Sequence, residues 1–393
     1  MPQIAWLGKK SPFCGNVTYG LSTTEALRRR GHTVNFIHFD TPAVSAARVP
    51  AAAGLPPASP EVALPYLVKS QVYTIPSLGA QRELRESLER LQPDLVHASL
   101  TLSPLDFRLP DLCQQLGLPL VATFHPAFDA GLRNLAAGTQ QLTYQLYAPS
   151  LARFDRVVVF SELQAEVLER LGVRAERLAV IPNGVDTDLW RPAIAPDAEL
   201  TELRRRFAGR RVFLYMGRLA TEKNVEALLR AWRLVRPAGC LLVIVGDGPQ
   251  RSVLQQVAGH DDNVLWWGYE PSLERRLALL QLAEVFLLPS LVEGLSLALL
   301  EAMACGAACV ATDAGADGEV LAGGAGIVIS TQGVTTQLRT LLPVLHHQPV
   351  LTAELGRRAR ERVLERYTLT RNIDALERLY DALLGRAVAV RGQ

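Results

Sequence analysis

Two glutamates, Glu293 and Glu301, stand in an E-x7-E spacing where a strand end, a polar turn and a helix start follow one another. Glu301 is expected inside a helix of apolar and small residues, where an unpaired carboxylate would cost several kcal/mol. A carboxylate in that position needs hydrogen-bond donors, such as the two hydroxyl groups of a nucleotide ribose. The backbone N–H groups at the helix start suit phosphate oxygens. These donors belong to Gly294, Leu295 and Ser296. Taken alone, the glutamates are also consistent with a capping carboxylate and a core-edge residue.

A second segment that could take part in chemistry is Tyr215-Met-Gly217-Arg218, which ends a buried strand and is followed by Lys223. Gly217 permits close approach of the backbone, and the two cations can neutralise a diphosphate as it leaves with developing negative charge. This chemistry needs no metal. Taken alone, Arg218 and Lys223 are also typical of a solvated helix entrance.

Three weaker signals lie at other expected strand ends. Gly246 and Gly248 form a glycine-rich turn before a helix, which lacks the full dinucleotide fingerprint and is also typical of an ordinary tight turn. Gly15 and Asn16 join the first strand to the first helix and are candidates for contact with phosphate or acceptor. His125 ends a strand, where functional groups of open α/β sheets tend to lie, although a lone histidine is often structural.

The sequence predicts neither a metal nor another cofactor. Asp186 and Asp188 form a DxD pattern in a segment expected to be a linker, away from any strand end. The five cysteines are scattered, odd in number and without CxxC spacing, which favours reduced thiols in a cytoplasmic protein. Residues 1–8 lack the pattern of a signal peptide, and the apolar stretches are interrupted by polar residues, so any membrane contact is expected to be peripheral.

Short aliphatic runs alternate with helical patterns along all 393 residues, which indicates parallel α/β architecture. Two such series predict two doubly wound, Rossmann-like domains facing across a cleft. We expect residues 1–185 to form the first domain and residues 186–369 the second, with a C-terminal helix at about 370–393 packing back on the first. The Pro- and Ala-rich stretch 41–66 is expected to be an insertion or loop.

The net charge of the chain is small, because 41 basic and 39 acidic side chains nearly balance. No broad field favours a nucleic acid or a strongly anionic partner. A local basic cluster, Arg28 to Arg30, and the 41–66 stretch are candidates for contact with a membrane surface, and equally for a basic helix end and a loop.

Taken together, these motifs resemble family 4 glycosyltransferases of the GT-B fold over essentially the whole chain. The resemblance also rests on Ser161-Glu162 and on Ile181-Pro-Asn-Gly-Val-Asp186. It implies a retaining, metal-independent hexosyltransferase in which the leaving phosphate accepts the acceptor's proton. Arg218 and Lys223 would hold the donor diphosphate, Glu301 the ribose and Glu293 the transferred sugar. His125 would contact the sugar and support charge at the anomeric centre. The first loop departs from many relatives, which carry two adjacent glycines there.

The opening Ile4-Ala-Trp-Leu-Gly-Lys-Lys-Ser-Pro-Phe-Cys-Gly-Asn-Val-Thr and the run from His97 to Asp106 look similar to cyanobacterial family 4 enzymes of digalactosyldiacylglycerol synthesis. That resemblance implies UDP-galactose as donor and monogalactosyldiacylglycerol, a glycolipid, as acceptor. The alternatives are a family 4 transferase acting on a soluble sugar or polysaccharide precursor, a nucleotide-sugar-binding protein without turnover, and a non-transferring epimerase. The sequence does not indicate an oligomeric state.

Overall fold

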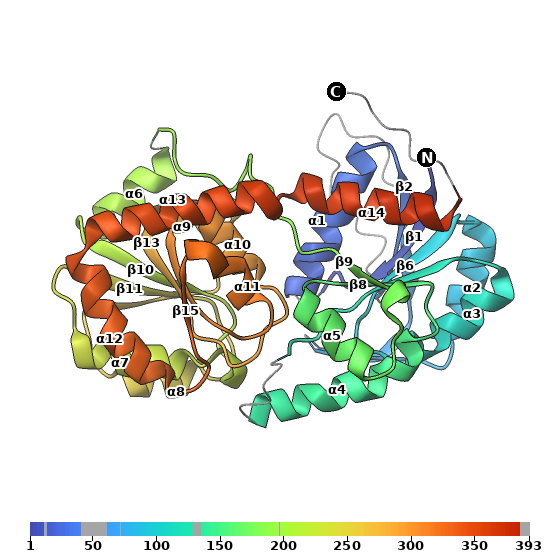
Figure 1. The fold of residues 1–393 in the computed structure, drawn as a ribbon, viewed down its shortest axis with the longest axis horizontal. Helices are drawn as coiled ribbons and strands as arrows, with labels where there is room; N and C mark the ends of the chain where they lie inside the picture. Colours follow the sequence, from blue (N-terminus) through green and yellow to red (C-terminus); the bar gives the residue numbers. More distant parts are fainter. Residues whose placement is uncertain (12–13, 41–60, 71, 129–134, 196, 386–393) are drawn as a thin grey trace. The chain divides into compact units, whose positions relative to one another are not determined.

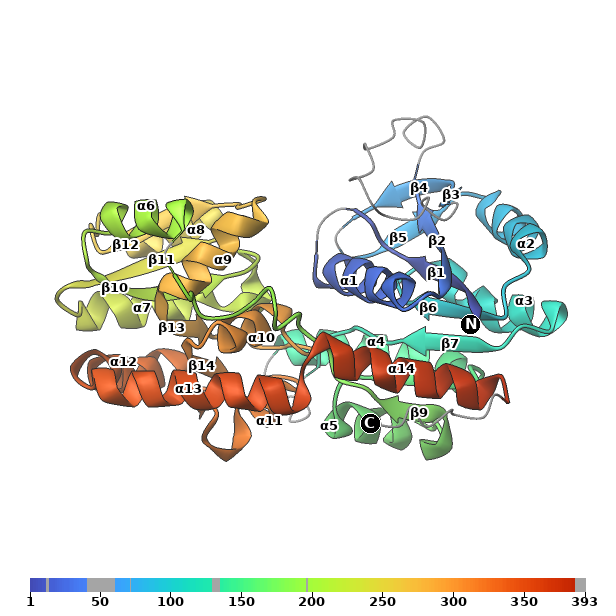
Figure 2. The same ribbon diagram turned by 90° about the horizontal axis from the view of Figure 1, so that it is seen from above.

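The computed structural model describes residues 1–11, 14–40, 61–70, 72–128, 135–195 and 197–385 (Figure 1). The chain divides into two compact units. The first unit comprises Met1–His125, Thr143–Ile181 and Asn372–Gln393, and the second comprises Pro126–Leu142 and Pro182–Arg371. Each unit contains a parallel β-sheet with helices on its faces, as Figure 2 shows from above. The α/β fold class expected from the alternating pattern is therefore confirmed.

The first unit is built on a seven-stranded sheet in the order β3-β2-β1-β6-β7-β8-β9, and every neighbouring pair is parallel. Its strands are β1 (Gln3–Gly8), β2 (Thr33–Phe39), β3 (Val62–Leu64), β6 (Leu95–Ser99), β7 (Leu120–Thr123), β8 (Arg156–Val159) and β9 (Leu178–Val180). The strand order reverses between β1 and β6. In doubly wound sheets, the loops beyond the carboxyl ends of such a pair form the usual ligand site.

The helices of this unit follow the amphipathic segments of the sequence. They are α1 (Gly15–Arg29), α2 (Ala80–Leu91), α3 (Leu109–Leu116), α5 (Glu162–Arg170) and most of α4 (Leu135–Leu151) and α14 (Leu369–Leu383). A short antiparallel pair, β4 (Tyr66–Lys69) and β5 (Thr74–Pro76), stands apart from the main sheet. Residues 62–64 of the expected insertion are in fact a sheet strand, because Val62 and Leu64 are buried against β2. Residues 41–60 lie outside the described residues.

Helix α14 is attached to the first unit by polar contacts that span the length of the chain. The Arg30 guanidinium donates to both Asp374 and Glu377, each at 2.6 Å. Deeper in the core, the Tyr380 hydroxyl lies 2.5 Å from Nδ1 of His97, whose Nε2 lies 2.7 Å from the Thr123 hydroxyl. Arg30, the residue that follows α1, therefore has intrachain carboxylate partners.

Replacing Tyr380 by Phe is expected to destabilise the first unit by about 1–3 kcal/mol, because it leaves Nδ1 of the fully buried His97 without its partner. The urea midpoint, followed by circular dichroism, should fall while the slope of the transition stays constant. Tyr73→Phe, at a side chain that is 46% exposed, is the matched control and should leave the midpoint unchanged. An unchanged midpoint for Tyr380→Phe would contradict a structural role for this contact.

The second unit has a six-stranded parallel sheet in the order β12-β11-β10-β13-β14-β15. Its strands are β10 (Arg211–Met216), β11 (Cys240–Val245), β12 (Val264–Gly268), β13 (Ala283–Leu288), β14 (Ala308–Thr312) and β15 (Ile327–Ile329). Here the order reverses between β10 and β13. The loops after these two strands carry Lys223 and Glu293.

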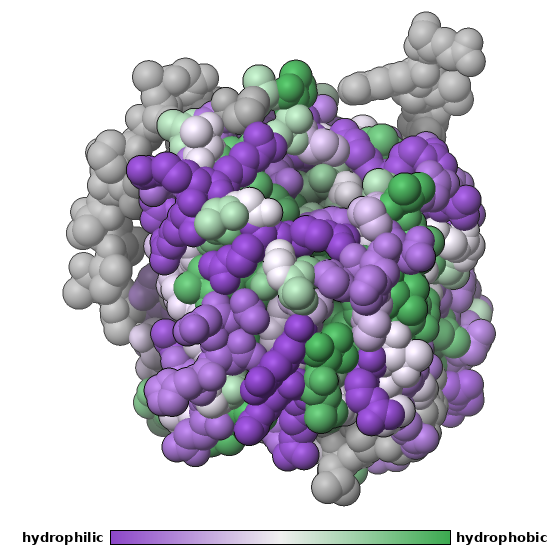
Figure 3. Space-filling model, turned by 90° about the vertical axis from the view of Figure 1, so that its left-hand side faces the viewer, coloured by the Kyte–Doolittle hydropathy of each residue, from purple (hydrophilic) through white to green (hydrophobic). Residues whose placement is uncertain are grey.

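Helices cover the second sheet along apolar faces. They are α6 (Ala198–Arg206), α7 (Val225–Val235), α8 (Arg251–Ala258), α9 (Leu273–Leu282), α10 (Leu297–Ala304), α11 (Asp317–Leu321), α12 (Val334–His347) and α13 (Pro349–Arg366). Helix α12 packs on α7, and α13 packs on β14 and α10. The face drawn in Figure 3 is mostly hydrophilic, with hydrophobic side chains interspersed. No helix within the described ranges is long and apolar enough to cross a membrane.

Candidate functional site

The centre of the candidate site in the second unit is an ion pair between the loops after β10 and β13. Lys223 ends a short 3₁₀ turn, and its ammonium donates to Oε1 of Glu293. The Ser290 hydroxyl donates to the same oxygen at 2.8 Å. Ser290 is fully buried and Glu293 is only 7% exposed. The structure therefore brings together two residues that lie 70 positions apart, at the point where the strand order reverses.

Arg218 stands in the same β10 loop but pairs with a different carboxylate. Its guanidinium donates to Glu222, four residues further along the chain. The backbone carbonyl of Arg218 accepts a hydrogen bond from the hydroxyl of Tyr215, a fully buried residue. Each cation of the predicted diphosphate site thus has one carboxylate partner, which balances its charge.

The glycine-rich turn after β11 packs directly on the β10 loop. Gly246 has a φ of +132°, and a Cβ placed there would lie 1.9 Å from the carbonyl oxygen of Gly217. A Cβ on Gly248 would lie 2.3 Å from the carbonyl oxygen of Leu219. The turn therefore supports the loop of Arg218 and Lys223 and leaves no room for a side chain at Gly246 or Gly248.

Substituting Gly246 with Ala is expected to displace the β10 loop, because the added methyl meets backbone and the conformation disfavours L-residues. We expect a lower melting temperature, together with a rate of the expected sugar transfer reduced by about tenfold or more, since small misplacements at candidate catalytic groups have large effects. Gly259→Ala is the control, because its φ is also positive (+66°) and nothing lies within 4 Å of a Cβ there. Equal behaviour of the two variants would contradict close packing of this turn as the cause.

The start of α10 is held by two side chains that the sequence analysis did not assign. The Ser296 amide, expected to contact phosphate, donates to Oδ1 of Asp317 at 3.0 Å. Asn183 donates from Nδ2 to the Leu295 carbonyl at 2.8 Å, which gives the Pro-Asn-Gly motif a structural part in this turn. The Gly294 carbonyl accepts from the amide of Ala316.

Asp317 is fully buried, and burial together with the nearby Glu293 carboxylate raises its pKa well above the usual range. Asp317 begins the five-residue helix α11, which the sequence pattern does not indicate. Its pairing with Ser296 depends on a contact between residues 21 positions apart. The Asp317 carboxyl group accepts from the Ser296 amide, so the other amides of this turn are the ones available to a phosphate.

Glu301 lies inside α10 and is 7% exposed. Burial raises the pKa of its carboxyl to about 7, and the positive charge of Arg276 opposes this only in part. Within the described part of the chain, the Glu301 side chain accepts no hydrogen bond, and none joins it to Lys223 or Glu293. Its carboxylate therefore retains its full capacity to accept hydrogen bonds from hydroxyl groups.

In the first unit, the structure brings Asn16 and His125 into one polar cluster at the carboxyl ends of β1, β6 and β7. Ser99 connects them: its hydroxyl lies 2.9 Å from Oδ1 of Asn16 and 2.8 Å from Nε2 of His125. Burial and the nearby Lys9 ammonium lower the pKa of His125 to about 3. Gly15 begins α1, and a Cβ there would meet nothing within 4 Å.

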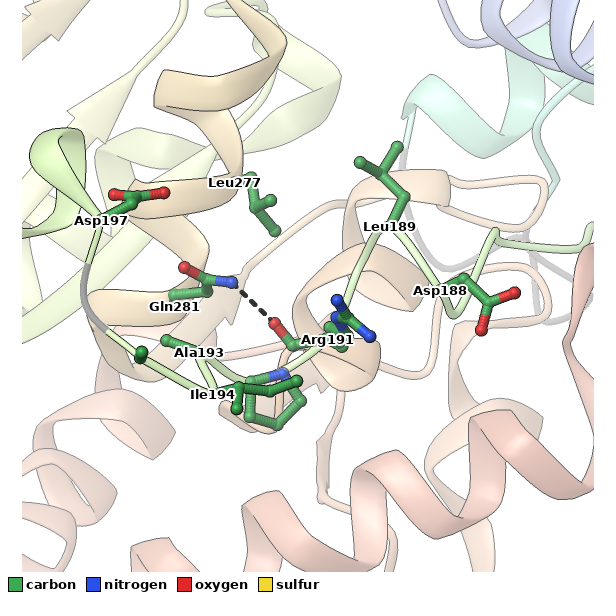
Figure 4. A pocket seen from close by; sticks show the side chains of 10 residues that line it. Asp188, Leu189, Arg191, Ala193, Ile194, Asp197, Leu277 and Gln281 are labelled. Carbon is green, nitrogen blue, oxygen red and sulfur yellow. Dashed lines mark hydrogen bonds between the residues drawn. The ribbon is translucent and has the colours of Figure 1, made fainter.

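A separate open pocket of about 290 Å³ lies in the second unit, between the segment after Asp186 and helix α9 (Figure 4). Gln281 closes one side by donating to the Arg191 carbonyl at 2.9 Å. None of the predicted site residues lines it. The DxD aspartate Asp186 accepts hydrogen bonds from the amides of Asp188 and Leu189, which is a local turn. The described residues contain no cluster of three or more His, Cys, Asp or Glu that could hold a metal.

Comparisons with known proteins agree with this architecture. Residues 15–189 match a family model described as Glycosyltransferase Family 4, and residues 210–343 match one described as Glycosyl transferases group 1. An alpha-maltose-1-phosphate synthase of Mycolicibacterium smegmatis is 29% identical over 64% of this chain and 70% of its own length. The putative glycosyltransferase EpsD of Bacillus subtilis is 25% identical over 78% of this chain and 81% of its own.

Two solved structures show the same fold. HepE of Anabaena, in complex with UDP-glucose, superposes with a TM-score of 0.76 at 19% identity, covering 96% of this chain and 99% of that one. Sucrose-phosphate synthase of Thermosynechococcus elongatus gives a TM-score of 0.77 at 20% identity, covering 98% and 100%. The two Rossmann-like units thus have the GT-B fold. With both halves matched by the family models, the chain belongs to glycosyltransferase family 4.

Proposed function

We propose that this enzyme transfers a hexose from a nucleotide-diphosphate sugar to a glycolipid, with retention of configuration and without a metal. The observation that carries the proposal is the Lys223–Glu293–Ser290 cluster at the strand-order reversal of the second unit. The solved HepE structures with UDP and UDP-glucose support a uridine diphosphate donor, since their fold is the same. We therefore assign donor binding to residues 186–369, and acceptor binding to residues 1–185 with the C-terminal helix.

The charges at the second unit suit such a donor. A diphosphate competes with Glu293 for the Lys223 ammonium and with Glu222 for the Arg218 guanidinium, because it offers more negative charge to each cation. Glu293 is then free to accept hydrogen bonds from hydroxyls of the transferred sugar, while Glu301 accepts them from the ribose. The two cations stabilise the diphosphate as it leaves, and the leaving phosphate accepts the acceptor's proton.

For the sugar and acceptor we propose UDP-galactose and monogalactosyldiacylglycerol, reached at a membrane surface. The resemblance of the N-terminal segments supports this choice. A relative from Streptococcus pneumoniae, 27% identical over 58% of this chain and 53% of its own length, is named alpha-monoglucosyldiacylglycerol synthase, after a glucosylated diacylglycerol. The second candidate is a soluble acceptor, favoured by the likeness to alpha-maltose-1-phosphate synthase.

The test is incubation of the purified protein, with EDTA present, with UDP-galactose and either monogalactosyldiacylglycerol in mixed micelles or a panel of soluble sugars and sugar phosphates. Mass spectrometry of the products identifies the acceptor, and the anomeric coupling constant in NMR identifies the configuration. We expect an α-linked digalactosyl lipid, the configuration of the UDP-sugar being α. Transfer only to soluble compounds would remove the lipid assignment, and an inverted product or inhibition by EDTA would remove the proposed mechanism.

A further inference from the structure

Asn16, Ser99 and His125 are connected by hydrogen bonds, and a single backbone carbonyl determines which group donates in each of them. We call these three residues the Asn16–Ser99–His125 relay, and all of them lie in the first unit. Asn16 contacts the Leu100 carbonyl through Nδ2 at 2.9 Å, and its Oδ1 lies 2.9 Å from the Ser99 hydroxyl. A carbonyl oxygen only accepts, so the amide NH₂ group must face Leu100 and the amide oxygen must face Ser99.

The same logic continues from Ser99 to His125. A serine hydroxyl has one hydrogen, and the amide oxygen of Asn16 requires it. The Ser99 oxygen then has only lone pairs to offer to Nε2 of His125, 2.8 Å away. Nε2 must therefore carry the hydrogen of this contact.

We propose that Asn16 and Ser99 are positioning residues that hold the His125 imidazole in the tautomer protonated at Nε2, so that Nδ1 acts only as a hydrogen-bond acceptor. A ligand group that meets Nδ1 must then be a donor, such as a sugar hydroxyl. A carbonyl or unprotonated phosphate oxygen cannot hydrogen-bond to Nδ1, because neither atom would carry a hydrogen. Within the described part of the chain, Nε2 to Ser99 is the only hydrogen bond of this ring.

The surroundings of the ring favour the neutral form that this arrangement requires. The Tyr19 ring meets the imidazole edge-on at 5.0 Å between centroids, and the Phe160 ring lies at 5.3 Å. These aromatic neighbours fix the plane of the ring, and burial with the Lys9 charge lowers its pKa to about 3. This pKa lies well below neutral pH, so any support that His125 gives to charge at the anomeric centre comes from a neutral imidazole. His125 acts through the dipole of a neutral ring.

The ligand class in this inference rests on the proposed sugar transfer, whereas the tautomer can be measured in the protein without any ligand. Nitrogen-15 labelling of histidine, with long-range ¹H–¹⁵N correlation spectra at pH 7, reports which ring nitrogen carries the hydrogen. The His125 signals are assigned by their loss in His125→Gln. We expect a protonated Nε2 and a bare Nδ1. A ring protonated at Nδ1, or at both nitrogens, would overturn the inference.

Substitutions within the relay test the cause of the tautomer. Asn16→Ala frees the Ser99 hydrogen to point at the ring, so signals of the Nδ1-protonated form should appear. Ser87→Ala removes another fully buried hydroxyl of the first unit and should leave the spectrum unchanged. Retention of the single tautomer in Asn16→Ala would overturn the role of the relay.

Kinetics with sugar-modified donors then test the ligand class. With the natural donor we expect Asn16→Ala to lower kcat/KM roughly fivefold to tenfold, the effect of one weakened hydrogen bond. Among monodeoxy UDP-sugars, one should show no further loss in Asn16→Ala, because it lacks the hydroxyl that donates to Nδ1. An equal loss for every deoxy donor would overturn this part of the inference. Absence of any transfer, with the tautomer as expected, would contradict the proposed function alone.

Discussion

Lys223→Ala is expected to lower kcat/KM for sugar transfer by roughly 10²–10³-fold, the usual effect of removing one preorganised charge partner from a developing anion. Among the described residues, two side chains donate to the buried Glu293 carboxylate. The Lys223 ammonium is the charged one, and the Ser290 hydroxyl is the other. Loss of the ammonium removes a cation from the proposed diphosphate site and leaves the Glu293 carboxylate without its ion-pair partner. Both effects oppose binding of a negatively charged donor, so donor affinity measured by calorimetry should fall as well.

Two further variants separate charge from geometry in this prediction. Lys223→Arg keeps the positive charge and should recover part of the activity. Arg230→Ala removes an exposed cation of α7 that pairs with Glu226, and should leave transfer unchanged. Wild-type kcat/KM in Lys223→Ala would contradict a diphosphate site between β10 and β13.

The sequence predicts the strands well where they are buried on both faces, because such strands appear as continuous aliphatic runs. The segments Gln3–Gly8 and Cys240–Val245 are short aliphatic runs in the sequence and strands in the structure. Strand β3 escapes notice because it has only three residues and follows a Pro- and Ala-rich stretch. Helix α6 is missed because its charged residues hide a narrow apolar face made by Leu200 and Leu203.

For the site, sequence pattern identifies the charged residues but not their partners. Glu293 and Lys223 attract attention by position and type, yet their pairing depends on the strand order of the sheet. Ser290, Ser99 and Asp317 are small polar residues at strand ends or turns, where such residues are common for many reasons. Their importance lies in contacts with residues distant in the sequence, which local patterns do not encode.

The basic cluster at the end of α1 illustrates the same limit. The sequence allows either a membrane contact or a basic helix end for Arg28 to Arg30. In the structure, Arg28 donates to the Val34 carbonyl and Arg30 pairs with two carboxylates of α14. Those carboxylates lie more than 340 positions further along the chain, so only the folded arrangement gives the cluster this role.

Glu301→Gln is expected to stabilise the ligand-free protein above pH 7 while it weakens donor binding. In the folded state, burial raises the pKa of Glu301 to about 7, above the ordinary value of 4.5. The folded protein therefore binds more protons than the unfolded chain between these values, and its stability falls as the pH rises from 4.5 through about 7. The full difference corresponds to about 3 kcal/mol above that range. Glutamine carries no charge, so it avoids this loss.

Thermal unfolding at pH 5 and pH 8, with and without UDP, tests this reasoning. At pH 8 the melting temperature of Glu301→Gln should exceed that of wild type by roughly 5–10 °C, and at pH 5 the two should nearly agree. UDP should raise the melting temperature of wild type strongly and that of the variant weakly, because an amide accepts ribose hydroxyls less well than a carboxylate. Glu365→Gln, at an exposed position of α13, should show neither effect.

Glu301→Gln is thus expected to raise the melting temperature of the ligand-free protein at pH 8 and to reduce the further rise caused by UDP. A residue kept for packing alone would lose stability on substitution and would leave the response to UDP unchanged. A buried carboxylate kept for ligand hydroxyls instead destabilises the ligand-free fold and recovers that free energy on binding. A lower melting temperature for Glu301→Gln at pH 8, with an undiminished response to UDP, would show that the ribose is held elsewhere.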